Sequence, residues 1–354
     1  MTSGANFRER LIDHRLYGLL LRGSGMATPG DVVGHLTAMQ AQDHTYARWS
    51  VAQRVAGVAD PSAVDAAFDD GHFLRTHVLR PTWHYVAAGD LWWLMRLSGP
   101  RVDAANARQC ESVGLGPRTL SQANEVVRRS VADGPRMRRE ILADLDGQGI
   151  SSAGLRSTLI LMHAELTSVV CSGPKRGKQH TYAAFDQRVG TRRGPEGEEA
   201  LAELAWRYFS TRGPATVRDF SWWAGLNSAD ARAGLESARP RLVSHDVDET
   251  TFWFAEQNVP RPGKPRVDLV PCYDEMVISY SQTRGLMQPG NTKFPFLSRV
   301  DGFYNVLLLD GELLGHWRAP SGTSVVEIRT DRVLDKRERA SLDEAIERYR
   351  QFAV

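Results

Sequence analysis

Apolar residues in the first hundred positions recur every three or four residues, a spacing typical of helices that pack through one face. Stretches with this spacing predict helices over 7–22, 31–36, 46–55, 61–68, 87–97 and 100–110. Gly23 and Gly25 end the first helix. Residues 72–80 and 82–86 predict paired strands around Pro81. Helices followed by a two-stranded ribbon indicate a winged-helix unit.

The same order of elements returns twice, without a strict sequence period. In the second unit, three helices precede two strands; their ranges are 118–132, 137–145, 155–165, 166–171 and 180–185. Ser151 and Ser152 are predicted to cap the third of these helices. The third unit repeats the pattern with helices 196–211, 217–224 and 229–238 and strands 241–245 and 251–254.

The last part of the chain is richer in strands. A proline-rich connection at 260–265 leads to predicted strands 267–269, 303–309, 312–317 and 325–329, and a helix at 335–352 follows. Asp310-Gly311 predicts a hairpin turn, and 281–298 is predicted to be a loop. The expected fold is mainly α with small β-hairpins (α+β). Its expected segments are three tandem winged-helix units and a C-terminal β-rich α+β segment, with boundaries 1–115, 116–193, 194–260 and 261–354.

Composition narrows the class of protein. Among 354 residues, 42% are hydrophobic and 24% charged, as in an ordinary globular protein. The chain has no apolar run near ~20 residues, so we expect no membrane span, and its polar start predicts a cytoplasmic protein. Cys110, Cys171 and Cys272 are far apart, which predicts neither disulfides nor a metal site. No cofactor is expected.

Charge alone does not identify a nucleic-acid-binding protein. The net charge is only +2, and five of the 44 basic residues are lysines. Codon bias in a GC-rich genome explains most of this preference for arginine. The loop at 172–179 is nevertheless basic, since it carries Lys175, Arg176 and Lys178. It is either a phosphate-contacting wing or a solvated turn, and we favour the wing. The third hairpin has an acidic turn at 246–250, which should avoid phosphate.

A second candidate for chemistry is the Gln40-Ala41-Gln42 run, followed at once by Asp43. These side chains lie within or between two predicted helices and serve no hydrophobic purpose. The alternative reading is a solvated helix face. Asp43 itself could be a general base, a partner that orients Gln40, or a helix cap, and we favour the cap.

Four segments together carry a resemblance to a known family. They are MQAQD at 39–43 with ARW at 47–49, LRPTWHYVAAGDLWWL at 79–94, LVPCYDEMVISY at 269–280 and LLDGELLGHWR at 308–318. In this ordered set the chain resembles the winged-helix DNA glycosylases related to the azinomycin-resistance enzyme AlkZ. The resemblance implies three winged helices around a concave channel for duplex DNA. It also implies that Gln40 and Gln42 are the catalytic pair of the Gln-x-Gln subgroup, which includes enzymes of self-resistance to DNA-alkylating antibiotics.

The chemistry of a glutamine pair is consistent with this implication. A neutral amide is a poor general base, but it can hold a water against the anomeric carbon. N7-alkylguanine is already cationic and leaves as a neutral base, so no general acid is needed. We therefore expect a monofunctional glycosylase for alkylated purines, and an open channel would admit bulky adducts and interstrand crosslinks. The first lysine is Lys175, so we expect no Schiff-base lyase activity.

The expected partner is double-stranded DNA carrying alkylated purines, bound by a monomer near the nucleoid. The candidate DNA contacts, chosen by charge and loop position, are Arg48, Lys175, Arg176, Lys178, Arg284 and Lys293. The alternative function is a non-catalytic winged-helix DNA-binding protein, either a regulator or a protein that sequesters lesions. A regulator would usually carry a separate effector domain, and the sequence suggests none.

Overall fold

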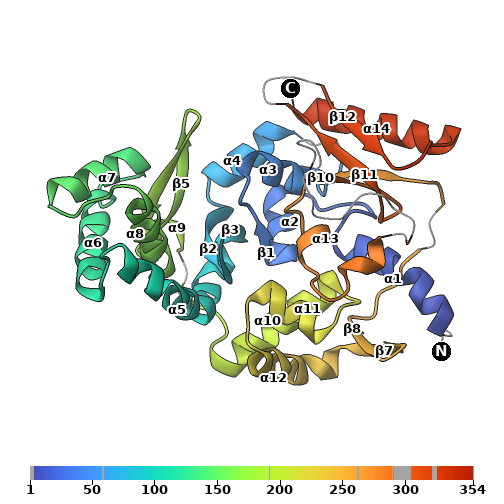
Figure 1. Ribbon diagram of the computed structural model, residues 1–354, viewed down its shortest axis with the longest axis horizontal. Helices are drawn as coiled ribbons and strands as arrows, with labels where there is room; N and C mark the ends of the chain where they lie inside the picture. Colours follow the sequence, from blue (N-terminus) through green and yellow to red (C-terminus); the bar gives the residue numbers. More distant parts are fainter. Residues whose placement is uncertain are drawn as a thin grey trace. The chain divides into compact units, whose positions relative to one another are not determined.

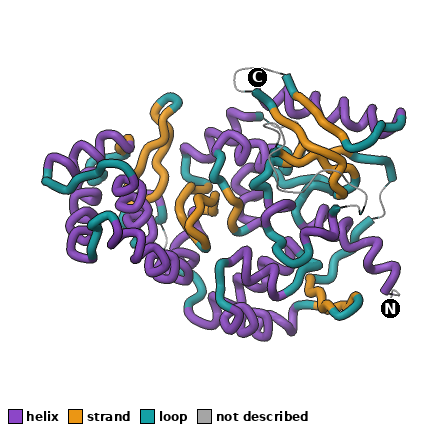
Figure 2. The backbone as a smooth tube through the Cα atoms, viewed as in Figure 1, coloured by secondary structure: helices purple, strands orange, loops and turns teal. Residues whose placement is uncertain are grey.

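The computed structural model describes residues 4–57, 60–190, 192–260, 263–288, 290, 304–320 and 325–353. Helices predominate among them and the strands are short and antiparallel, which confirms the predicted α+β class (Figures 1 and 2). The chain forms two compact units. The first unit combines Met1–Val64 with Leu201–Val354, and the second is Asp65–Ala200. The finer division into four segments, and their winged-helix form, stay predictions.

The chain begins with four helices and one short strand, and the last of these helices crosses from the first unit into the second after Val64. They are α1 (Gly4–Gly18), α2 (Pro29–Leu36), β1 (Ala38–Gln40), α3 (His44–Ala52) and α4 (Pro61–Asp69). Thr28 and Asp31 form a capping box at the start of α2. The helix ends at Leu36. Its C-cap residue, Thr37, has a φ of 64°, which turns the chain sharply into β1.

Three further helices and a hairpin follow residue 196, and from Leu201 onward they belong to the first unit. They are α10 (Gly197–Arg212), α11 (Val217–Ala224), α12 (Ser228–Ala238), β7 (Val243–Val247) and β8 (Thr250–Phe254). Thr216 and Asp219 form a capping box at α11, and Asn227 caps α12. Side-chain oxygens thus accept from the free N–H groups at both helix starts.

The C-terminal part of the first unit is a four-stranded antiparallel sheet with a helix against it (Figure 1). The strand order is β12-β11-β10-β9, and the elements are β9 (Val267–Val270), α13 (Glu275–Ile278), β10 (Asn305–Leu309), β11 (Glu312–Arg318), β12 (Glu327–Thr330) and α14 (Lys336–Ala353). Asp310 and Gly311 both have positive φ in the β10–β11 turn, as the Asp-Gly pair predicted. Helix α14 packs against β9.

The second unit pairs two hairpins with a group of helices. Its elements are β2 (Phe73–Val78), β3 (Arg80–Ala87), α5 (Ala88–Ser112), α6 (Pro117–Ser130), β4 (Arg136–Met137), α7 (Arg138–Gly147), α8 (Leu155–Leu166), β5 (Val170–Arg176), β6 (Gln179–Ala184) and α9 (Phe185–Arg188). The antiparallel pairs are β2 with β3, β5 with β6 and β4 with β6. Val127, Ile141 and Ile160 are fully buried where α6, α7 and α8 meet.

Three details of the second unit correct the sequence prediction. The two helices predicted on either side of Pro100 form one helix, α5, which still contacts α8 beyond the proline through the hydrogen bonds of Asp103 with His163 and of Asn106 with Met162. The predicted loop 172–179 is mostly strand, so the turn shrinks to Gly177 and Lys178. The N-cap of α8 is Gly154 rather than Ser151 or Ser152; the hydroxyl of Ser152 instead bonds Asp146.

Candidate active site

The Gln-Ala-Gln run lies in the connection between α2 and α3, in agreement with its predicted place at a helix junction. Gln40 is the last residue of β1 and is only 8% exposed. Ala41 is fully buried, and Gln42 is exposed. The run therefore starts in the core of the unit and reaches the surface within two residues, with one amide side chain on each side of that boundary.

Asp43 is the N-cap of α3. Its carboxylate accepts a hydrogen bond from the backbone N–H of Tyr46 at 3.2 Å, and its own backbone is extended, as the N-cap position requires. The cap that the sequence favoured is thus present in the structure. The cap also explains why α3 begins at His44 and not at Tyr46, where the hydrophobic pattern starts.

The backbone of Gln40 is held by a buried carboxylate from a distant part of the chain. Its N–H donates to Glu275 at the start of α13 over 2.9 Å. The second carboxylate oxygen of Glu275 accepts from Arg212 at 2.7 and 3.1 Å, from Ser279 at 2.8 Å and from the indole N–H of Trp223 at 2.8 Å. Glu275 is 1% exposed. Its two oxygens are therefore surrounded by donors and shielded from water.

Glu275 is ionised despite its burial. Burial alone would raise the pKa of this carboxyl, but Arg212 and the hydrogen bonds from Gln40 and Ser279 outweigh it and hold the pKa below its usual value. A carboxylate stabilised in its charged form by this many donors has little tendency to take up a proton. Glu275 is accordingly unsuited to be the general base of a reaction at Gln40.

Arg212 extends the same network along the strand. One of its terminal nitrogens donates to the carbonyls of Leu36 at 3.0 Å and of Ala38 at 2.8 Å. These two carbonyls flank Thr37, a β-branched residue at positive φ, where such residues are strained. The guanidinium also lies 4.3 Å from the ring centre of Trp223. Arg212 thus fixes the strained turn that leads into β1.

A second buried ion pair anchors Asp274, the residue before Glu275. Asp274 accepts two hydrogen bonds of 2.7 Å from the guanidinium of Arg54, and both side chains are fully buried. Arg54 also donates to the carbonyl of Ser50 in α3 at 2.6 Å. The Asp-Glu pair of the segment 269–280 therefore binds on both sides of the Gln-Ala-Gln run, at β1 and at the end of α3.

Sequence reasoning missed these four charged residues as parts of the site. Asp274 and Glu275 were quoted only for the family resemblance, and Arg54 and Arg212 were not singled out. One signal was present, because two carboxylates inside the apolar run 269–280 must find partners if the run is buried. The sequence does not say which arginines those partners are.

The candidate DNA contacts in the first unit are partly engaged within the protein. Arg48 is half-buried and donates to the carbonyl of Pro61 at 3.3 Å. Arg284 donates to the carbonyl of Val277 at 2.9 Å, and burial lowers the pKa of its guanidinium. Lys293 lies outside the described residues. A DNA contact by Arg48, Arg284 or Lys293 stays a prediction.

The three basic residues of the second unit share the β5–β6 hairpin but differ in their partners. Lys175 forms a 2.6 Å ion pair with Asp65, and Arg176 forms one of 3.1 Å with Glu140. Lys178 is exposed in the turn. Among these three, Lys178 is the one whose charge is most accessible to a phosphate, although DNA contact by any of them stays a prediction.

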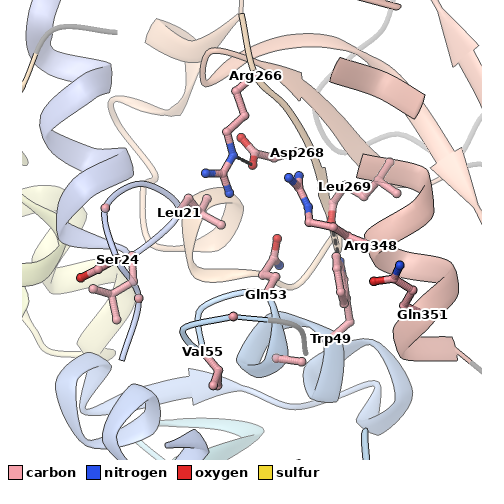
Figure 3. A pocket seen from close by; sticks show the side chains of 15 residues that line it. Leu21, Ser24, Trp49, Gln53, Val55, Arg266, Asp268, Leu269, Arg348 and Gln351 are labelled. Atoms are coloured by element: carbon pink, nitrogen blue, oxygen red, sulfur yellow. Dashed lines mark hydrogen bonds and ion pairs between the residues drawn. The ribbon is translucent and has the colours of Figure 1, made fainter. Parts of the chain in front are cut away.

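A cavity of about 270 Å³ lies in the first unit at the other end of α3 (Figure 3). Its wall includes Trp49 of α3 and Gln53 just after that helix, Arg266 and Asp268 from the β9 region and Arg348 from α14. Arg266 pairs with Asp268 at 3.2 Å across this wall. Neither Gln40 nor Gln42 lines the cavity. The glutamine run therefore has its own surroundings, separate from this cavity.

Within the described ranges, no group of three or more His, Cys, Asp or Glu side chains is arranged to hold a metal ion. In the same part of the chain, every helix is too short or too polar to cross a membrane. The described arrangement is thus one of amides, buried ion pairs and helix caps.

Comparison with known proteins places these features in a family. A family model described as DNA glycosylase AlkZ-like matches residues 33–352. An interstrand DNA cross-link repair glycosylase of Streptomyces sahachiroi is 31% identical over an alignment of 307 residues, and the match covers 81% of this chain and 81% of that protein. The solved structure of Streptomyces sahachiroi DNA glycosylase AlkZ matches with a TM-score of 0.77 at 19% identity and covers 98% of this chain and 97% of that chain. On this sequence match, the chain belongs to the AlkZ-like DNA glycosylase family.

Proposed function

We propose that the protein is a monofunctional DNA glycosylase that hydrolyses the N-glycosidic bond of N7-alkylguanine in duplex DNA, including bulky adducts and interstrand crosslinks. Family membership supports the reaction class, and the similarity to the interstrand cross-link repair glycosylase of Streptomyces sahachiroi supports crosslinked DNA as a substrate. The observation that carries the proposal is the Gln-Ala-Gln run, whose backbone is tied to a buried ion pair while Gln42 is exposed to the surface.

In the proposed reaction, Gln40 and Gln42 hold one water by accepting hydrogen bonds from its O–H groups and aim its lone pair at the anomeric carbon. The water oxygen bonds to that carbon as the bond to N9 breaks, and the departing electron pair neutralises the positive charge of the alkylated base. The released proton goes to solvent. Positioning of this kind contributes up to about 7–11 kcal/mol in the most favourable systems. Normal guanine lacks the charge that makes it a good leaving group, so the uncharged amides spare it.

We propose further that the segments 1–115, 116–193 and 194–260 are winged-helix units and that, with 261–354, they form a concave channel for duplex DNA. An open channel suits a crosslinked or bulky lesion, because such a base cannot swing out of the duplex into a tight pocket. The reaction should end at an abasic site, since no lysine precedes Lys175 to form a Schiff base near the glutamine run.

The test uses a labelled duplex that carries a single N7-methylguanine, and a second duplex that carries a bulky N7 adduct. Each is incubated with the wild-type protein and split into three portions, treated with hot alkali, with borohydride, or with neither. The proposal predicts strand breaks only after alkali and no trapped protein–DNA adduct. A trapped adduct would show a lyase. Binding without breaks on either duplex would instead indicate a non-catalytic DNA-binding protein.

A further inference from the structure

We propose that Glu275 and Arg212 are positioning residues for catalysis, and that they act through the backbone of Gln40 without touching the substrate. The proposal rests on the function proposed above, because it explains what holds the glutamine pair in the position that placement of the water requires. Glu275 lies 235 residues from Gln40 in sequence, and Arg212 lies 63 residues before Glu275.

Arg212 and Glu275 both bind the backbone at one edge of β1. Arg212 binds the carbonyls of residues 36 and 38, and Glu275 binds the N–H of residue 40. Ala38 and Gln40 are alternate residues of β1, so these two groups face one edge of the strand, where a neighbouring strand would normally bind them, while the carbonyl of Leu36 belongs to the last residue of α2. The ion pair of Arg212 with Glu275, at 2.7 Å, substitutes for such a strand on this edge. It therefore sets the position of the Gln40 backbone, from which the amide projects.

The ion pair of Arg212 with Glu275 is itself rigidly held. Arg212 is the last residue of α10, and Glu275 is the first residue of α13. Trp223 of α11 donates to Glu275 and lies against the guanidinium of Arg212, while Ser279 bonds both side chains. Three helices thus meet at one fully buried ion pair, which leaves neither side chain free to change rotamer.

The backbone of Thr37 is strained, and Arg212 binds on both sides of it. A threonine at φ 64° persists only where its surroundings impose that conformation. The carbonyls on both sides of Thr37 are those that Arg212 binds. Loss of the pair would let the turn relax, and Gln40 lies only three residues further along. A displacement of about 1 Å in a positioning group can cost on the order of 100-fold in rate.

The experiment compares two buried carboxylates of the same unit. Glu275→Gln keeps the length of the side chain, but its amide has one oxygen to share between Gln40 and Arg212 and presents an N–H to the remaining donors. Asp219→Asn is the matched control. Asp219 is fully buried and accepts from Thr216 and from residues 281–283, and none of its hydrogen bonds reaches 36–40.

Three quantities are measured for each variant on the N7-methylguanine duplex: the single-turnover rate constant at saturating protein, the Kd for DNA, and the thermal unfolding midpoint. We expect Glu275→Gln to lose on the order of 100-fold in rate with unchanged Kd. Asp219→Asn should lose a similar amount of thermal stability and stay within a few-fold of the wild-type rate. The residual rate of Glu275→Gln should keep the pH profile of the wild type, because Glu275 is not a base.

A rate loss in Glu275→Gln no larger than in Asp219→Asn would overturn the proposal, as would a loss that appears only in Kd. A pH profile that changes shape would make Glu275 a catalytic group instead. If Glu275→Gln does not fold, Arg212→Lys replaces it, since lysine can reach Glu275 but cannot also span the two carbonyls. Failure of the proposed function is distinguishable, because the wild-type protein would then release no base.

Discussion

Asp43 offers a sharp test of whether the glutamines or a carboxylate carry the chemistry. It lies one residue after Gln42, and its carboxylate accepts from the N–H of Tyr46 at the start of α3. Two substitutions separate its roles. Asp43→Asn keeps a side-chain oxygen for the cap but removes the charge, and Asp43→Ala removes both.

The magnitudes differ enough to distinguish the roles. Loss of an N-cap costs about 1 kcal/mol, and asparagine caps a helix about as well as aspartate. For a unit of roughly 200 residues, 1 kcal/mol lowers the unfolding midpoint by about 2–4 °C. A general base, by contrast, contributes about 10²–10⁴-fold in rate. We therefore expect Asp43→Ala to lose a few degrees, Asp43→Asn to lose less, and both to keep near-wild-type rates.

The assay combines thermal unfolding with single-turnover release of N7-methylguanine at saturating protein. Saturation removes any effect of weakened DNA binding from the measured rate constant. Equal rate losses of 100-fold or more in Asp43→Asn and Asp43→Ala would refute the reasoning, because the two variants share only the missing charge. Asp43 would then be the base, and the glutamines would play a supporting role.

Three further predictions follow from particular contacts. Burial lowers the pKa of His180 to about 4. The unfolded chain therefore binds more protons than the folded chain between pH 4 and 6.5, so the stability of the fold decreases as the pH falls through that range. His180→Gln should reduce this pH dependence when stability is measured by urea unfolding. Lys178→Ala should weaken DNA binding and lower the slope of log K against log salt concentration by about one ion. Lys175→Ala removes a lysine that is ion-paired with Asp65 and should leave this slope unchanged. Titrations at several salt concentrations measure both slopes. Gly311→Ala places a methyl group against Ile12 at a positive φ and should cost about 1–3 kcal/mol in chemical unfolding.

Local chemistry made much of the secondary structure predictable. The predicted helix 217–224 coincides with α11, because Thr216 and Asp219 cap its start and Gly225 ends it in the left-handed conformation. The Asp310-Gly311 turn was predictable because this pair of residues favours the positive φ angles that a tight hairpin turn requires. Where tertiary packing overrides a local signal, prediction failed. Pro100 should end a helix, yet α5 continues through it, and beyond the proline Asp103 and Asn106 still bond His163 and Met162 of α8.

The candidate site was predictable only in part. The position of Gln40 and Gln42 between two helices followed from the pattern of apolar residues, and their catalytic role was taken from the family resemblance and stays a proposal. The partners of their backbone could not be found, because Arg212 and Glu275 belong to segments that approach β1 only in the folded chain. Burial of Asp274 and Glu275 required cationic partners, but 39 arginines and five lysines were available and nothing local chose among them.

The proposed reaction depends on an uncharged glutamine pair that positions the attacking water. Its most direct test is the single-turnover release of N7-methylguanine from duplex DNA by wild type, Gln40→Ala and Gln42→Ala, each at saturating protein and with its Kd for DNA measured in parallel. We expect each substitution to lower the rate on the order of 100-fold or more at unchanged Kd. Wild-type rates in either variant would contradict it and leave that glutamine as an ordinary residue of a helix connection.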